Sequence, residues 1–126
     1  MIRYCTQDEA PHLLFELEEA VSESEVRRGL AGLLDDLQTL PNDFVMLAVY
    51  PEMTFFEADA VGPLFYYVAR IFDAAPGFCV FVDGGRSPHP GLRAFIEQIG
   101  LDDQVAFVPT REEADARIQQ YLQSAH

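Results

Sequence analysis

The segment Thr54–Leu64, TFFEADAVGPL, holds the residues whose types and spacing most suggest chemistry. Glu57 and Asp59 flank Ala58 where an apolar, strand-like run gives way to a helical pattern. Pro63 has no N–H and fits only the first turn of a helix, so the helix must begin close to Asp59. Asp59 is then a candidate N-cap, and Glu57 lies near the positive end of the helix dipole. The two carboxylates either cap the helix or form a charged surface for a partner.

Metal, hydrolytic and nucleophilic chemistry is not predicted elsewhere in the chain. The candidate ligands fall on separate elements, without the spacing of a metal site: Cys5, His12, Cys79 and His89. Adjacent acidic pairs diverge from each other and cannot face one another across a substrate as hydrolase carboxylates do: Asp35–Asp36 and Asp102–Asp103. The chain has no G-x-S-x-G motif and no lysine, which a phospho-receiver site needs. We therefore expect a non-enzymatic protein without metal or cofactor.

One turn offers an alternative of a different class. Gly84, Gly85 and Arg86 follow the apolar strand 78–82, and the backbone N–H groups of such a turn can hold an anion. The segment has neither a G-x-G-x-x-G nor a GK[ST] motif, and prolines at 88 and 90 remove two donors. A tight strand-to-helix turn explains the paired glycines better, and nucleotide binding is kept as the enzyme-class alternative.

The charge limits the kinds of partner. Eight arginines against 21 acidic residues give a formal net charge of −13 in 126 residues. Such a field repels nucleic acid and anionic membranes, so we expect neither nucleic-acid binding nor membrane insertion. Two distant cysteines, no signal-peptide pattern and no long apolar run predict a cytoplasmic protein. The excess of acidic residues either keeps the protein soluble or favours binding to a basic or neutral protein partner.

The apolar pattern predicts a single domain, 1–126, with strands and helices in the order β-β-α-β-α-β-α-β-α. Strands are expected at 2–6, 12–17, 44–50, 78–82 and 105–108. The four helices are predicted from apolar stripes and from S/T-x-x-E capping boxes. The stripe of the second helix is expected to consist of Val61, Leu64, Phe65, Val68 and Phe72. Short connections favour a mixed sheet with helices packed on it.

Two segments resemble the STAS domain, the family of bacterial anti-sigma factor antagonists and of regulatory modules in anion and lipid transporters. FVMLAVYPEMTFFEADAVGPLF is similar to the family's apolar strand, polar turn and Thr-Phe-Ile-Asp-Ser-Ser-Gly-Leu-Gly-x-Leu motif. LRAFIEQIGLDDQVAFVPTREEADARI is similar to the family's ending, with a helix closing in Gly-Leu, a strand, a Pro-Thr/Ser turn and a Glu-Glu-Ala helix start. The resemblance covers nearly the whole chain and implies an α/β fold, a STAS-type mixed β-sheet with about four helices packed on it.

Along the motif, Glu57 matches the family's Asp, Ala58 its phosphorylated Ser, and Asp59 the following Ser. Alanine has no hydroxyl, so the usual phospho-switch is missing at its usual place. The resemblance implies an anti-sigma factor antagonist-like protein whose partner is an anti-sigma factor that is also a kinase. The alternative partner is a subunit of a lipid or solute ABC transporter, and a homodimer is also possible.

We expect partner binding at the first turn and outer face of the second helix. The predicted contact residues are Glu57, Ala58, Asp59, Val61, Gly62 and Tyr66. With the apolar stripe turned inwards, at least one of the tyrosines 66 and 67 should lie towards the outer face. An exposed aromatic ring is a common anchor for a protein partner, although both rings could instead fill gaps between helices.

Overall fold

The computed structural model describes residues 1–18, 20–49, 55–82, 90–99 and 104–124. Its main sheet has five strands in the order β1-β2-β4-β6-β7. The strands span Ile2–Thr6, Leu13–Leu17, Val45–Val49, Phe78–Val82 and Val105–Val108. β1 runs antiparallel to β2, and the other neighbours are parallel. β4 and β6 are almost wholly buried and apolar, as central strands covered on both faces must be.

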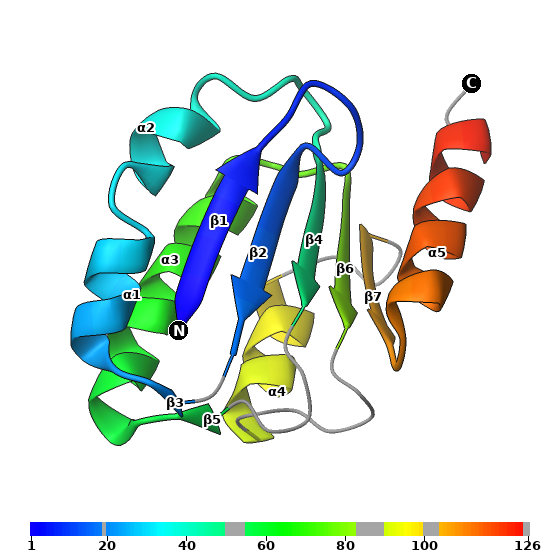
Figure 1. The fold of residues 1–126 in the computed structure, drawn as a ribbon. Coiled ribbons are helices and arrows are strands. Elements are labelled where there is room, and N and C mark those ends of the chain that lie inside the picture. The colour runs from blue at the N-terminus through cyan, green and yellow to red at the C-terminus, as the bar shows by residue number, and fades with distance from the viewer. Residues whose placement is uncertain (19, 50–54, 83–89, 100–103, 125–126) are drawn as a thin grey trace.

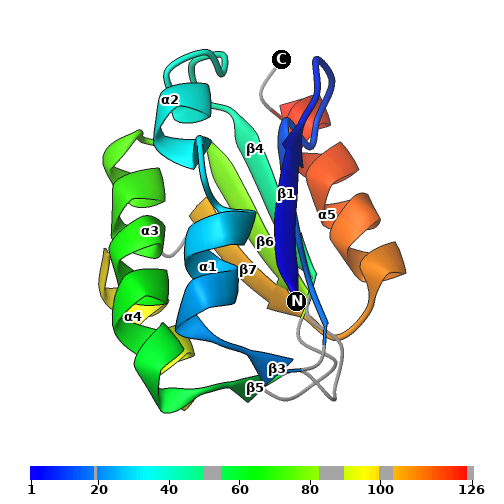
Figure 2. The ribbon, with the colours of Figure 1, turned by 60° about the vertical axis from the view of Figure 1, so that its left-hand side comes forward.

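Helices cover both faces of this sheet. Four of them lie on one face: α1 (Glu23–Gly29), α2 (Leu33–Leu37), α3 (Val61–Asp73) and α4 (Pro90–Ile99). Of the described helices, α5 (Arg111–Ser124) is the one on the other face (Figures 1 and 2). Two apolar cores result, a larger one under α1 to α4 and a smaller one between α5 and strands β4, β6 and β7. The carboxyl ends of the parallel strands lie at the same end of the sheet as the start of α3 (Figure 1).

The predicted α/β class and mixed sheet are confirmed, with two differences in the elements. The first predicted helix is divided into α1 and α2, because Gly32 adopts a left-handed backbone with φ of 85°. The described residues therefore form five α-helices instead of about four. A second, two-stranded sheet, β3 (Ala20–Val21) with β5 (Phe55–Phe56), was also not predicted. Strands of two residues carry too little periodicity to be recognised in a sequence.

Tyr4 of β1 fixes the junction between α1 and α2. Its hydroxyl donates to Asp36 Oδ2 at 2.6 Å and lies 3.3 Å from the carbonyl oxygen of Ala31. Burial, followed by the hydrogen bond to Asp36 and the charges of Asp36 and Asp35, raises the pKa of Tyr4 to about 12. The neutral phenol is therefore the form that stabilises the junction between the helices.

We predict that Tyr4→Phe lowers the free energy of unfolding by about 1 kcal/mol at neutral pH, since one hydrogen bond to a partly exposed carboxylate is lost. The pKa is raised in the folded state, so this stabilisation is complete below the unfolded pKa near 10 and is lost as the pH rises towards 12. Urea unfolding of both proteins between pH 8 and 11 checks this. A difference between them that stays constant up to pH 11 would contradict the assignment.

Candidate functional site

The corner that leads into α3 is held in place by the small sheet. After β5, the N–H of Glu57 donates to the carbonyl oxygen of Val21, at the end of β3, at 2.9 Å. A 3₁₀ turn then spans Ala58–Ala60, and the N–H of Ala60 donates to the carbonyl oxygen of Glu57 at 2.9 Å. Ala60 is fully buried, whereas Ala58 and Asp59 are exposed. The corner therefore has one side chain in the core and its neighbours in solvent.

The predicted N-cap role of Asp59 is wrong. The helix does begin close to Asp59, but Asp59 lies inside the 3₁₀ turn, and Glu57 occupies the N-cap position of that turn. Neither the turn nor α3 receives a side-chain capping bond. Glu57 and Asp59 are both exposed, and neither forms an ion pair within the described residues. The two carboxylates are thus open to solvent beside the amino end of a 13-residue helix, where anionic groups are favoured.

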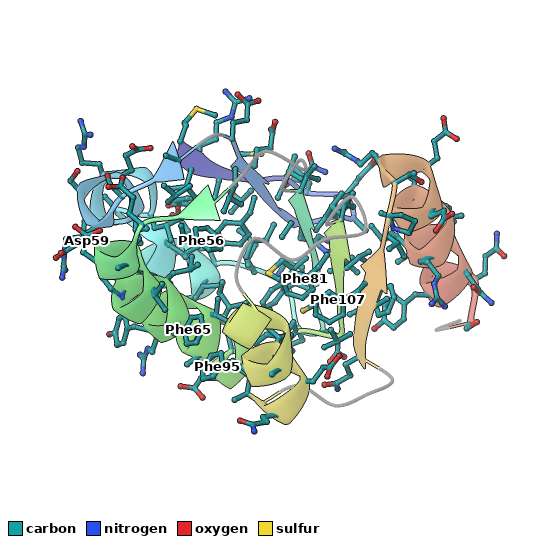
Figure 3. The ribbon with its side chains drawn as sticks, turned by 90° about the horizontal axis from the view of Figure 1, so that it is seen from below. Phe56, Asp59, Phe65, Phe81, Phe95 and Phe107 are labelled. Atoms are coloured by element: carbon teal, nitrogen blue, oxygen red, sulfur yellow. The ribbon has the colours of Figure 1, made fainter. Side chains whose placement is uncertain are left out.

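The outer face of α3 continues this surface. Gly62 is exposed, and a side-chain carbon added there would meet no atom within 4 Å. One turn later, Tyr66 is 54% exposed and contacts the half-buried ring of Tyr67 edge-on, with 5.6 Å between ring centroids. The expectation that one of the two tyrosines faces outwards is confirmed. Helical spacing places Asp59, Gly62 and Tyr66 on one side of the helix, and Asp59 lies at the periphery of the molecule in Figure 3.

The inner face of α3 packs on the sheet, but only in part. Leu64 and Ile71 are buried, and Ile71 was missing from the predicted stripe. The remaining stripe residues are only half-buried: Val61, Phe65, Val68 and Phe72. Phe65 stacks on Phe95 of α4, with 4.6 Å between ring centroids (Figure 3). A cavity of about 50 Å³, lined by apolar side chains and the ring of Tyr67, remains between α3 and the sheet. It has room for little more than a methyl group or two, so we assign no ligand to it.

The structure thus brings together five of the predicted contact residues at one corner: Glu57, Ala58, Asp59, Gly62 and Tyr66. Val61 is half-buried beside them. Gly84, Gly85 and Arg86 lie outside the described residues. No group of three His, Cys, Asp or Glu side chains able to hold a metal ion occurs among the described residues. Within that same part of the chain, no helix is both long enough and apolar enough to cross a membrane.

Cysteine chemistry does not add to this corner. Cys79 is fully buried in β6, and its burial raises the pKa of the thiol. A thiol of this kind is inert as a nucleophile at neutral pH. Cys5 is exposed on β1, a strand that is not part of the corner.

Comparisons with known proteins bear on the fold. No family model matches the sequence, and no curated protein matches it. Among solved structures, the chain is similar to the anti-sigma factor antagonist SpoIIAA in its unphosphorylated form, with a TM-score of 0.57 and 17% sequence identity. The match covers 92% of this chain and 97% of SpoIIAA. The STAS-type fold implied by the sequence resemblance is therefore confirmed.

Gly62 gives a direct test of the geometry of this surface. We predict that Gly62→Ala raises the free energy of unfolding by about 0.5–1 kcal/mol, because alanine is the better helix former and its methyl group would meet nothing. Thermal and urea unfolding measure this change.

Gly29 is the matched control at the end of α1. A side-chain carbon there would clash with the carbonyl oxygen of Ile2, so Gly29→Ala is expected to destabilise the protein. A Gly62→Ala variant that is also less stable than the wild type would show that the Gly62 site is not open.

Proposed function

We propose that this protein is a non-enzymatic regulatory module of the anti-sigma factor antagonist type, which acts by binding another protein. The partner-binding surface consists of Glu57, Ala58, Asp59, Val61, Gly62 and Tyr66. The shared fold with an anti-sigma factor antagonist supports this class of function. The open corner at the start of α3 supports the location.

The observation that carries the proposal is the exposed glycine between an acidic and an aromatic residue. Glycine forms helices less readily than alanine, by about 0.5–1 kcal/mol within a helix, and Gly62 lies in the first turn of α3, where nothing within the described residues requires it to lack a side chain. A partner that approaches the backbone closely explains its presence. Asp59 and Tyr66, on either side along the helix, would then contact that partner through charge and through an aromatic ring.

The partner is expected to be basic or neutral where it meets this surface. Glu57 and Asp59, which form no ion pair with the described residues, belong to a chain whose net charge is −13. Such a field speeds the association of positively charged surfaces and disfavours acidic ones. Among partner classes, an anti-sigma factor with kinase activity fits the resemblance to the STAS family, and a transporter subunit is the alternative.

Affinity capture from the native cell, followed by mass spectrometry, tests the surface and identifies the partner. We expect Tyr66→Ala to lower the recovery of the partner at least tenfold, as loss of an aromatic anchor does. Gly62→Ala should also lower recovery although it stabilises the fold. The control is Gln119→Ala, an exposed change on α5, at the opposite face of the sheet.

Equal recovery by the wild type, Tyr66→Ala and Gly62→Ala would contradict the proposed surface. Capture of a histidine-kinase-like anti-sigma factor would support the signalling function, and capture of a permease or an ATPase subunit would assign the protein to a transporter. Retention of a nucleotide by the purified protein would favour the enzyme-class alternative.

The expected loss of phosphorylation at residue 58 can be tested separately. We predict that the wild type is not phosphorylated at residue 58 by a kinase partner, whereas Ala58→Ser is, because residue 58 is exposed at the corner and the substitution supplies the acceptor. Phosphate-affinity electrophoresis and peptide mass spectrometry measure the modification. A kinase partner that modifies the wild type and Ala58→Ser equally, at another residue, would show that the switch has moved and has not been lost.

A further inference from the structure

β1 leaves one edge of the main sheet open. Among the described residues it pairs only with β2, and Figure 2, which views the molecule from the β1 side, shows β1 in front of the other strands. β1 has no proline and no bulge, two devices that prevent a further strand from pairing with an edge, and Arg3 is its one charged residue. Its residues, IRYCT, are mostly of types that favour strands.

The hydrogen-bond pattern shows which residues face the open side. The N–H of Glu18 donates to the carbonyl oxygen of Met1, and the N–H of Gln7 donates to that of His12. Hydrogen-bonded pairs alternate along an antiparallel ladder, so the odd-numbered residues of β1 bond to β2. The N–H and C=O groups of the even-numbered residues, including Tyr4 and Thr6, point outwards.

α1 covers the first half of this edge, so only the second half of β1 is open. The carbonyl oxygen of Ile2 also points outwards, but Gly29 packs so closely against it that even a methyl group would not fit. Tyr4 and Thr6 therefore remain as the outward-facing pair. Their main-chain groups have no partner within the described residues.

We propose that β1 pairs antiparallel with β1 of a second copy of this chain, which joins the two main sheets into one. With only Tyr4 and Thr6 available, the two-fold axis passes through Cys5, and Tyr4 of each copy exchanges two hydrogen bonds with Thr6 of the other. Four main-chain hydrogen bonds hold this contact, so the dimer forms reversibly and depends on concentration.

Charge and shape favour a second copy as the occupant. In this register Arg3 lies opposite Gln7 of the other copy, next to its exposed and acidic Asp8 and Glu9. No like charges face each other across the ladder, an arrangement that would weaken it. The face of β1 that carries Arg3 and Cys5 is exposed, so the second sheet meets no helix there.

Disulfide formation between the two Cys5 residues can test the register of the proposed β1–β1 pairing. Cys5 of the two copies would form a non-hydrogen-bonded pair, in which the Cα atoms are about 4.5 Å apart, within the range for a disulfide. Oxidised glutathione is the test oxidant: two Cys5 thiols give up two protons and two electrons, the disulfide forms, and one glutathione disulfide becomes two glutathione molecules. Cys79 is buried and does not compete.

The test compares Cys5 with a cysteine at a neighbouring exposed position. We expect the wild type to form a disulfide dimer on non-reducing gels at least tenfold faster than the double variant Cys5→Ser/Arg3→Cys. In the predicted register the two residues at position 3 would be about 13 Å apart, beyond the reach of a disulfide. Arg3 is well exposed, with an ion pair to Glu16 that contributes little to stability, so its replacement preserves the fold. Equal rates for the two proteins would indicate random collision and overturn the proposal.

A second variant and a measurement without cross-linking complete the test. Thr6→Pro removes the outward N–H without breaking a bond within the chain, and proline is tolerated on an edge strand. We expect it to slow Cys5 cross-linking at least tenfold. In the unmodified protein under reducing conditions, exchange of the Tyr4 and Thr6 amides should slow as the protein concentration is raised towards about 1 mM. Exchange that is independent of concentration would overturn the dimer even if Thr6→Pro fails to fold.

Discussion

The burial of Ala60 is the constraint on which the proposed surface depends. Its methyl group is fully buried in the larger core, in a turn that packs against α1 and α3, and the small sheet of β3 and β5 fixes the chain immediately before it. A buried residue in a tight 3₁₀ turn leaves its neighbours only the outward direction. Ala58 and Asp59 are therefore held in solvent by the packing of a third residue. A larger side chain at position 60 would disturb the whole corner.

The start of α3 lacks several features that usually stabilise a helix. It has no side-chain cap, it carries an exposed glycine in its first turn, and only two of its 13 residues are buried. Two other helix starts are capped: Ser22 accepts from the N–H of Glu25, and Thr110 accepts from that of Glu113, whereas α2, which follows Gly32, also begins without a side-chain cap. The feature that sets the start of α3 apart is an exposed glycine one turn before an exposed tyrosine. The proposed docking surface would account for both, since a partner would cover Gly62 and the ring of Tyr66.

Much of the fold was predictable because the long elements have strong periodic patterns. The central strands, the amphipathic α3 and the two capping boxes follow directly from residue spacing. The break between α1 and α2 was not predictable, since Gly32 in a helical pattern is compatible with either a kink or a continuous helix. The position of Asp59 within the 3₁₀ turn was not predictable either. Glu57, Ala58 and Asp59 all lie at a distance from Pro63 that suits the residue before a helix. Ile71 was missed because both Ile71 and Phe72 fit the apolar stripe, and only the packing decides which is buried.

Amide hydrogen exchange of this protein, alone and in complex with its captured partner, is the decisive test of the proposed surface. We expect slowed exchange to be concentrated in residues 57–66, while the outer face of α5 exchanges at the same rate in both states. Protection of α5 or of the amino ends of the strands, with residues 57–66 unchanged, would contradict it.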